Sequence, residues 1–375
     1  MKLLVISSAP IVELDGKLHL YAPYEKEMQL WAKHADTIQF CCPIWREDKK
    51  LLIAPVSFEV EKVVELQEFD IISFSNKLKA IPLAFVALVK IFKAMKQADH
   101  IHLRCPGNIA LLACLVQILF SNKQKTAKYA GNWDPKSKQP WSYRLQKWVL
   151  SNTFLTRNMQ VLVYGEWEGS SKNIKPFFTA TYSEEEIARR GDEETRRMGD
   201  EVKFLFVGTL SKGKQPLYAI QLVEALYRQG KNVLLDLYGE GVLRTDLERY
   251  IAENKLETLI VLKGNQTKET LLKAYQSHHF LILPSKSEGW PKVVAEAMFW
   301  GCVPIASAVS CVAYMMGNGS RGVVLQENLD QDVRQITTII NNQEQYKKMA
   351  SDGQSWSRQF TTDKFEIEIK KLLRG

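Results

Sequence analysis

Two glutamates lie eight residues apart in the C-terminal half of the chain, at Glu288 and Glu296. An apolar run ends at Pro284, a polar turn that contains Glu288 follows, and an amphipathic helix is predicted to open at Pro291. The free amide groups of a helix start attract anions such as phosphate. A carboxylate in that turn would lie beside the phosphate, where it can accept hydrogen bonds from hydroxyl groups. The pattern would suit a sugar joined to a nucleoside diphosphate.

A second turn, residues 208–215, joins another predicted strand to another predicted helix. Gly208 would let the backbone approach a ligand, and Lys212 and Lys214 place two cations beside a helix start. Cations and amides there would stabilise the negative charge that collects on a diphosphate as its bond to a sugar breaks. Solvated lysines in an ordinary turn would give the same pattern. Together with the acidic pair, however, the turn favours a site that includes Lys214.

Two further predicted strands end in glycines, at Gly239 and Gly241 and at Gly264. One Gly-x-Gly is a weak signal, but at the mouth of the same sheet these residues would flank a nucleotide. The full Gly-x-Gly-x-x-Gly fingerprint is missing, which argues against a nicotinamide-dependent oxidoreductase.

Residues 285–301 resemble the acidic-pair motif of the family-four retaining glycosyltransferases (glycosyl transferases group 1), in which one Glu follows another after eight residues. The surrounding residues that match the same pattern are Ser285, Gly289, Pro291, Ala297 and Gly301. The resemblance covers most of the chain and is strongest over 204–325. It implies a GT-B fold, with two Rossmann-like doubly wound domains facing a central cleft. It also implies a nucleoside-diphosphate sugar as donor substrate and transfer with retention of configuration.

The resemblance assigns roles to individual residues. It implies that Glu296 binds the ribose hydroxyls, that Glu288 contacts the donor sugar and that Lys214 stands at the family's Lys position. Thr209 stands where the family has Arg, and Lys212 is the candidate substitute. The expected donor-binding residues are Gly208, Thr209, Lys212, Lys214, Gly239, Gly241, Gly264, Glu288, Gly289, Trp290, Pro291 and Glu296. The expected catalytic residues are Glu288, Lys214 and Asn132.

The N-terminal half supplies the expected acceptor side, with polar groups where predicted strands end. Many family members carry a His near position 130 or 131; this chain does not, so Asn132 or Asp134 is expected to orient the acceptor. The family's glycine-rich first loop is also missing, and Gly16 is expected to mark its turn. His19, Tyr21 and Tyr24 would line an acceptor pocket or simply anchor the loop. The expected acceptor-side residues are Gly16, His19, Tyr21, His102, Arg104 and Asp134, although a lone His102 is more often structural.

Length and composition limit the number of domains and the class of protein. The 375 residues suffice for two domains, and 46% apolar with 25% charged residues is typical of a soluble globular protein. Six cysteines without a Cys-x-x-Cys pair predict neither a zinc site nor a disulfide framework, and fit a reducing cytosol. No secretory signal and no apolar run of roughly 20 residues is evident, so no transmembrane segment is predicted.

Apolar, β-rich runs alternate with helical patterns, which predicts α/β domains with parallel sheets. The expected strands of the first half are 2–7, 37–42, 71–75, 100–103, 126–130 and 160–163, and those of the second half are 203–207, 232–238, 258–262, 279–283, 303–307 and 322–325. The domains are expected at 1–182 and 202–360, joined by a charged linker at 183–201. The resemblance implies that a last helix, within 361–375, packs back on the first domain.

The net charge of +8 lies wholly in the first half, where residues 1–180 hold 24 Lys and Arg against 16 Asp and Glu. A basic half could face an anionic membrane or a lipid-diphosphate acceptor, or it could be a solubilising surface. Residues 77–96 are basic and amphipathic. A core helix is favoured for them over a membrane-surface helix. Asp330 and Asp332 have the spacing of a metal-binding pair but are expected to cap a helix at 330–340, and no metal is expected.

The pattern therefore favours a cytoplasmic glycosyltransferase, working at the inner face of the membrane or away from it, that uses a nucleotide sugar in the assembly of cell-surface polysaccharide. Its expected partners are that donor and a carbohydrate or lipid-linked acceptor, with peripheral membrane contact through the basic half. The alternative is a catalytically silent subunit that binds nucleotide or sugar, motivated by Thr209 and the missing His. No nucleic-acid-binding module is recognised.

Overall fold

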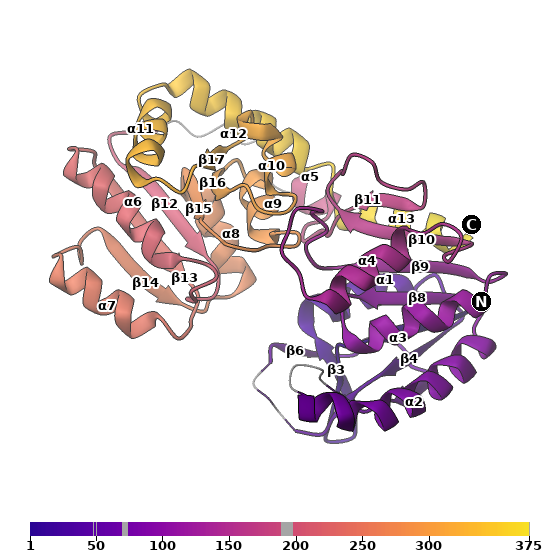
Figure 1. The fold of residues 1–375 in the computed structure, drawn as a ribbon. Helices are drawn as coiled ribbons and strands as arrows, with labels where there is room; N and C mark the ends of the chain where they lie inside the picture. The colour runs from indigo at the N-terminus through magenta and orange to yellow at the C-terminus, as the bar shows by residue number, and fades with distance from the viewer. Residues whose placement is uncertain (48, 50, 70–73, 189–197, 375) are drawn as a thin grey trace. The chain divides into compact units, whose positions relative to one another are not determined.

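The computed structural model describes residues 1–47, 49, 51–69, 74–188 and 198–374. These residues form two compact units (Figure 1). The first comprises Met1–Phe177 with the end of the chain, Lys364–Gly375, and the second is Phe178–Asp363. The described part of the expected linker contains a short helix, α5 (Glu184–Ala188), which belongs to the second unit, whereas residues 189–197 lie outside the described part of the chain.

The first unit is built on a seven-stranded parallel sheet in the order β11-β10-β9-β8-β1-β4-β7. Strand β1 (Lys2–Ser7), an inner strand of the sheet, is apolar on both faces, as is usual for a parallel strand covered by helices. The strands are β1 (Lys2–Ser7), β4 (Thr37–Cys42), β7 (Lys62–Glu65), β8 (His100–Cys105), β9 (Gln124–Tyr129), β10 (Met159–Tyr164) and β11 (Ile174–Phe177). The strand expected at 71–75 falls largely on residues outside the described part, and the edge of the sheet is formed instead by β7.

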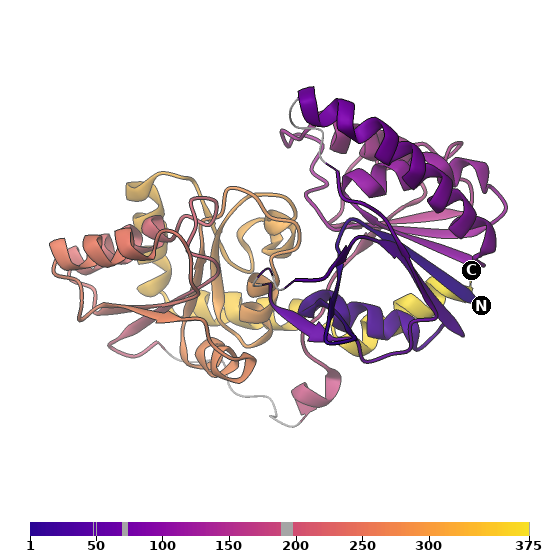
Figure 2. The same cartoon turned by 90° about the horizontal axis from the view of Figure 1, so that it is seen from below.

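Helices cover both faces of this sheet, as Figure 2 shows in an edge-on view. One face carries α2, α3 with the 3-10 turn η1, and α4; α1 and α13 lie on the other. Their bounds are α1 (Ala22–Ala32), α2 (Phe74–Gln97), α3 (Asn108–Val116), η1 (Gln117–Leu119), α4 (Trp141–Ser151) and α13 (Thr362–Arg374). Helix α13 is held by Glu366, whose carboxylate is 3.0 Å from both Lys33 and His34, and by Phe365, which packs on Phe177.

The segment after β1 forms a small sheet, where the sequence suggested only a loop. Its four strands run in the order β5-β2-β3-β6, with a hairpin between β2 and β3. Asp15 and Gly16 have φ values of 49° and 71°, as the two central residues of a hairpin turn with positive φ require. The strands are β2 (Ile11–Leu14), β3 (Lys17–Tyr21), β5 (Ile44–Trp45) and β6 (Ile53–Pro55).

The second unit has a six-stranded parallel sheet in the order β14-β13-β12-β15-β16-β17. The strands are β12 (Val202–Val207), β13 (Val233–Tyr238), β14 (Ile260–Gly264), β15 (Phe280–Leu283), β16 (Val303–Ser307) and β17 (Val323–Leu325). Successive strands are added on one side of β12 as far as β14, and from β15 onward they are added on its other side, so β12 and β15 are neighbours. A switch point of this kind opens a ligand crevice at the carboxyl ends of the strands.

The helices of this unit are amphipathic and bury one apolar stripe each against the sheet. They are α6 (Pro216–Arg228), α7 (Arg244–Glu253), α8 (Lys268–Ser277), α9 (Lys292–Phe299), α10 (Val312–Met315), η2 (Gly317–Gly319), α11 (Leu329–Ile340) and α12 (Gln343–Ser357). The cap of α11 is Asn328 and not the expected Asp330. Asp332 is buried, and accepts hydrogen bonds from the Tyr218 hydroxyl and the Gln326 amide.

Among the described residues, no helix combines the length and the apolar character needed to cross a membrane. The same part of the chain holds no group of three or more His, Cys, Asp or Glu side chains placed to bind a metal ion.

Candidate functional site

The loops after β12, β13 and β14 meet at the carboxyl edge of the second sheet. The Gly208 amide donates to the Tyr238 carbonyl at 2.9 Å, and the Gly239 amide donates to the Gly264 carbonyl at 2.9 Å. The Leu210 amide likewise donates to the carbonyl of Glu240 at 3.0 Å. Three strand ends are thereby tied together by main-chain hydrogen bonds, and the glycines predicted from sequence lie in one region.

Glycine is required in these loops because their backbones touch. A Cβ on Gly239 would overlap the Gly208 carbonyl, and φ at Gly239 is +138°, a value that other residues rarely adopt. A Cβ on Gly241 would overlap the Leu210 carbonyl in the same way. The Gly-x-Gly pattern is therefore explained by the packing of these loops against one another.

Lys214 and Glu288 lie together at this edge. The ammonium Nζ of Lys214 is 2.5 Å from Oε1 of Glu288, and the side chains are 30% and 9% exposed respectively. The two residues come from the β12–α6 and β15–α9 connections, which are 74 positions apart in sequence. The Lys214 ammonium and the Glu288 carboxylate therefore lie in contact, close to the starts of α6 and α9.

Main-chain contacts hold the two connections side by side. The Lys286 amide donates to the Gly213 carbonyl at 2.9 Å, and the Gln215 side-chain amide donates to the Pro284 carbonyl at 2.6 Å. Gln215 precedes α6 with a left-handed φ of 53°, which turns the chain into the helix. Neither α6 nor α9 has its first turn capped by a side chain of the described residues, and the positive end of a helix dipole favours an anion.

Glu296, the second member of the acidic pair, lies on α9 and is half-buried. Its Oε1 accepts a hydrogen bond from the Thr181 hydroxyl at 2.8 Å, and its Oε2 accepts one from the Tyr275 hydroxyl at 3.0 Å. Burial of Tyr275, together with the negative charge of Glu296, holds the pKa of the Tyr275 phenol well above its usual value. The phenol therefore remains a hydrogen-bond donor and fixes the carboxylate. Sequence reasoning missed both partners, which a buried carboxylate requires.

The remaining expected donor-binding residues differ in exposure. Lys212 and Thr209 are exposed, whereas Trp290 and Pro291 are buried. The Trp290 ring packs near Trp356 and Phe360, so its side chain belongs to the core behind the turn. Ser310 and Cys311 donate hydrogen bonds to the carbonyl of Gly289, at 3.2 and 3.1 Å. These two contacts fix the turn that carries Glu288.

On the first unit, the expected acceptor residues are scattered over separate structures. Gly16 lies in the hairpin turn, His19 and Tyr21 lie on β3, and Asn132 and Asp134 follow β9. Oδ1 of Asn132 accepts from the Asp134 amide and Oδ1 of Asp134 accepts from the Lys136 amide, both at 2.8 Å. The two polar side chains thus shape their own turn, and their role toward an acceptor remains a proposal.

His102 and Arg104 do not suit an acceptor surface. The His102 ring is fully buried, 2.8 Å from the Thr126 hydroxyl and against the Trp31 ring, and burial lowers its pKa to about 3. Arg104 lies over the Tyr24 ring and pairs with Glu27 at 3.2 Å. We therefore correct the prediction for His102, because a neutral ring enclosed in the sheet has no surface for a sugar, and Arg104 has a structural partner.

Glu27 is the centre of this buried polar cluster. Its carboxylate also lies 3.0 Å from Nζ of Lys128, which is 1% exposed. Burial would raise the pKa of Glu27, but the charges of Lys128 and Arg104 outweigh it and lower that pKa to about 2. The cluster is a paired charge network inside the first unit, and it connects α1 to β8 and β9.

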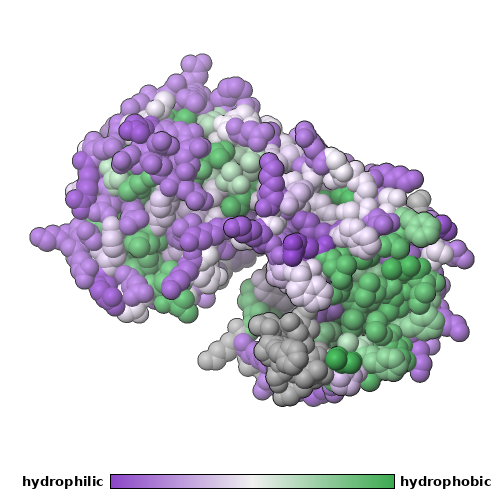
Figure 3. Space-filling view, in the orientation of Figure 1, coloured by the Kyte–Doolittle hydropathy of each residue, from purple (hydrophilic) through white to green (hydrophobic). Residues whose placement is uncertain are grey.

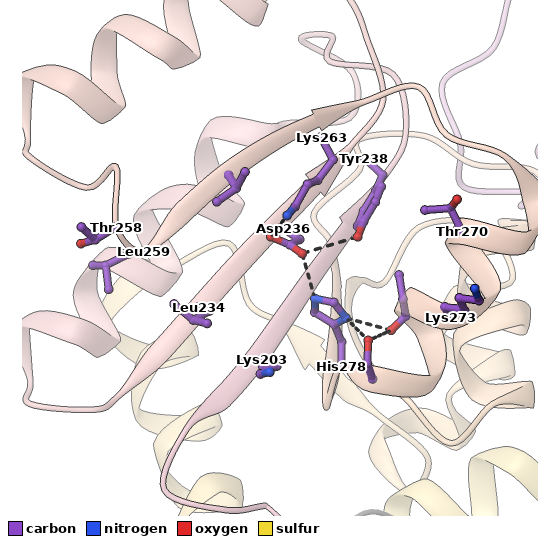
Figure 4. A pocket seen from close by; sticks show the side chains of 13 residues that line it. Lys203, Leu234, Asp236, Tyr238, Thr258, Leu259, Lys263, Thr270, Lys273 and His278 are labelled. Carbon is purple, nitrogen blue, oxygen red and sulfur yellow. Dashed lines mark hydrogen bonds and ion pairs between the residues drawn. The ribbon is translucent and has the colours of Figure 1, made fainter.

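A polar pocket of about 450 Å³ lies beside β12, β13 and β14 of the second sheet (Figure 4), and its lining includes neither Lys214 nor Glu288. At its centre Asp236 is 3.4 Å from His278 and 3.5 Å from Lys263. Burial would raise the pKa of Asp236, but the hydrogen bond from His278 and the charge of Lys263 lower it overall. These charged groups pair with one another. Lys203 lines the pocket at the amino-terminal end of β12.

The part of the chain that contains this site resembles a known protein family. Residues 189–356, which contain Lys214 and both glutamates, match the family model described as Glycosyl transferases group 1. This part of the chain is similar to the glycosyl transferases group 1 family. The match thus covers the carboxyl edge just described.

Individual relatives show the same similarity. The chain is 26% identical over 156 residues to an uncharacterized glycosyltransferase of Methanocaldococcus jannaschii, covering 39% of this chain and 44% of the relative. It is 33% identical over 173 residues to an uncharacterized glycosyltransferase of Haemophilus influenzae, covering 45% and 48%. The chain thus spans less than half the length of these curated relatives.

A solved structure extends the similarity to the whole fold. Anabaena HepE, crystallised with UDP and glucose, superposes with a TM-score of 0.65 over 100% of this chain and 98% of its own, at 15% identity. At that identity the likeness concerns the fold alone. The chain has the two parallel-sheet α/β domains of the GT-B type, in agreement with the expected fold class.

Proposed function

We propose that this protein transfers a sugar from a nucleoside-diphosphate sugar to a carbohydrate or lipid-linked acceptor, with retention of configuration. The single observation that carries the proposal is the placement of Lys214 and Glu288 at one sheet edge, between two uncapped helix starts. A cation and free amides suit a diphosphate, and carboxylates suit the hydroxyls of ribose and sugar. Glu296, on the helix that follows Glu288, supplies the second carboxylate.

The proposed roles follow from this chemistry. Lys214 and the amides of α6 and α9 receive the diphosphate, and they stabilise the charge that grows on it as the bond between C1 of the sugar and the phosphate oxygen breaks. Glu288 holds hydroxyls of the sugar, and Glu296 holds those of the ribose. The acceptor hydroxyl forms the new bond to C1 on the same face, and its proton passes to the departing phosphate oxygen. No separate protein base is needed in this scheme.

The acceptor side is proposed on the first unit, with Asn132 and Asp134 as candidate orienting residues. The basic charge of that unit suits an anionic or lipid-diphosphate acceptor. We place the enzyme in the cytoplasm or at the inner face of the membrane, in the assembly of cell-surface polysaccharide.

The alternative is a catalytically silent nucleotide- or sugar-binding protein of the same fold. It is favoured by Thr209, which is exposed at the position where the family has Arg and therefore supplies no second cation. Lys212, exposed three residues later, is the candidate replacement.

A donor screen separates these possibilities. The protein is incubated with UDP-, GDP- and ADP-sugars and a panel of carbohydrate and polyprenyl-diphosphate acceptors, while nucleotide release and the anomeric configuration of the product are measured. We expect release to depend on both donor and acceptor and the product to keep the donor's configuration. Donor binding without turnover in every combination would favour the silent protein, and absence of binding to any nucleotide would contradict both.

A further inference from the structure

The outer side of α2, α3, η1 and α4 carries an unusual number of large exposed apolar side chains. Of the eighteen such residues in the described part of the chain, ten lie on these elements or on the turn after α4. They are Ile81, Phe85, Val86, Val89, Phe92, Leu115, Leu119, Trp141, Trp148 and Phe154. We name this surface the α2–α4 face. Figure 3 shows a continuous apolar area over the same elements.

Helix α2 is apolar on two sides. Its buried side, with Ala87, Ile91 and Met95, packs on the sheet as the expected core helix would. Its other side exposes Phe85, which is 68% exposed, together with four more apolar residues of the face. A helix that served only as a cover for the sheet would present polar residues there, so packing on the sheet does not explain the second side.

Contacts join the helices into one surface. The Phe92 ring of α2 lies 5.2 Å from that of Phe120, which follows η1 and so extends the apolar area from one helix to the next. Leu119, at the end of η1, is 70% exposed beside it. On α4, Trp141 and Trp148 are seven residues apart and hence on the same side of the helix. Exposed apolar patches of this extent mark interaction sites.

The exposed charges described on these helices are positive. The sequence of residues 77–160 as a whole contains 14 Lys and Arg against 2 Asp and Glu, and of these Lys125 and Lys128 are buried inside the unit. Lys90, Lys93 and Lys96 are exposed on α2, as are Arg144 on α4 and Arg157 beyond it, where the Arg157 guanidinium lies over the Phe154 ring. Long basic side chains can extend from an apolar surface toward phosphate groups.

We propose that the α2–α4 face docks on an anionic lipid bilayer, with the apolar side chains in the headgroup and acyl boundary and the lysines and arginines against lipid phosphates. The combination of an apolar face with a cationic border is that of helices lying in a membrane interface. Trp and Phe suit this boundary because their rings are apolar and, for Trp, carry one polar group. A second copy of the chain is a poorer occupant, because a symmetric contact would bring two rings of positive charge together.

The test is co-sedimentation of the full chain with vesicles of phosphatidylcholine alone and with added phosphatidylglycerol. We expect binding to the anionic vesicles, weaker by at least tenfold to neutral ones and reduced by salt. Phe85→Asp and Trp148→Asp should each reduce anionic binding by at least tenfold. Lys93→Gln and Lys96→Gln should each reduce it by about fivefold. Val242→Asp and Tyr227→Asp, at exposed apolar residues of the second unit, are matched controls and should bind as the wild type does.

Folding and self-association are followed in parallel. Circular dichroism and thermal melting of every variant show whether it folds, and Phe92→Ser is a milder replacement should an aspartate variant fail. Equal binding to neutral and anionic vesicles, no binding at all, or binding that survives in folded variants of the face would overturn the proposal. So would a wild-type dimer that Phe85→Asp converts to a monomer without any change in lipid binding. Nucleotide affinity, measured on the same samples, keeps this result separate from the proposed function.

Discussion

The Lys214 ammonium is paired with the Glu288 carboxylate at 2.5 Å, across two strand-to-helix connections. A diphosphate bound beside Lys214 would therefore compete with Glu288 for the same ammonium. The pair orders both connections, and a donor would recruit the ammonium for phosphate while the carboxylate turns to sugar hydroxyls. The two residues should thus respond to mutation in opposite ways.

Lys214→Ala should weaken the binding of free nucleoside diphosphate by about 10- to 100-fold, because a charge-assisted contact is lost. Glu288→Gln should leave that binding unchanged or tighter, since the competing charge is removed, yet lower the transfer rate by about 100-fold or more. Calorimetric titration with nucleotide and an assay of nucleotide release measure the two effects. Lys203→Ala, at the amino end of β12, is the control. Equal loss of nucleotide affinity in both site variants would argue against the assigned roles.

Tyr275 should act as a positioning residue for Glu296. Tyr275→Phe removes the donor that lies 3.0 Å from Oε2 and should weaken nucleotide binding by about 3- to 10-fold, less than Glu296→Ala does. The specific readout is the affinity difference between a nucleoside diphosphate and its 2′,3′-dideoxy analogue. That difference should be large in the wild type, smaller in Tyr275→Phe and absent in Glu296→Ala. If all three proteins discriminate equally, Glu296 does not bind the ribose.

Gly239→Ala should destabilise the second unit by more than about 2 kcal/mol, because the new Cβ would overlap the Gly208 carbonyl at a φ that alanine avoids. Gly213→Ala is the matched control, since the nearest atom to its Cβ would be the Ser211 hydroxyl at 4.0 Å. Its effect should stay within about 0.5 kcal/mol. Urea unfolding of both variants measures the difference, and equal stabilities would show that the loops do not pack as described.

The stability of the first unit should depend on pH through its buried histidines. Burial lowers the pKa of His102 to about 3 and that of His100 to about 4, against about 6.5 in an unfolded chain. The unfolded chain therefore takes up protons first as the pH falls. The contribution of the two histidines to the free energy of unfolding is complete above about pH 6.5 and is lost as the pH falls toward about 4 for His100 and about 3 for His102. The slope should be about 1.4 kcal/mol per pH unit for each histidine.

Replacement of one histidine isolates this contribution. The His102→Gln variant should lose about half of the histidine-dependent slope between pH 6 and 4.5, whatever its absolute stability. Gln124→Ala, at an exposed residue without a titratable group, should keep the wild-type slope. Chemical unfolding at several pH values, followed at a probe in the first unit, measures both. An unchanged slope in His102→Gln would mean that the ring is accessible to protons in the folded state.

Much of the fold was predictable from local pattern, and the exceptions have physical causes. Strands such as β1 and β12 are continuous apolar runs flanked by polar turns, so their sequence alone identifies them. The hairpin of β2 and β3 was missed because short strands with mixed burial give no clear alternation. The cap of α11 was misplaced because three polar residues compete within five positions, and only packing decides that Asp332 is buried.

The candidate site was predictable to the extent that it lies in contiguous motifs. Spacing identified Lys214, Glu288 and Glu296, whereas nothing local links Glu296 to Tyr275 or Thr181, which lie 21 and 115 positions away. His102 was misassigned because a residue at the end of a strand can point into the sheet as well as out of it. Sequence thus identifies the charged groups, while the tertiary fold decides which of them have structural partners.

A crystal structure of the chain with an intact nucleoside-diphosphate sugar, chosen from the donor screen, tests the central claim most directly. We expect the diphosphate within hydrogen-bond distance of Lys214 and of the first amides of α9, the ribose hydroxyls on Glu296 and the sugar beside Glu288. A donor bound elsewhere, with the Lys214–Glu288 pair unchanged and no ligand atom near it, would contradict the account.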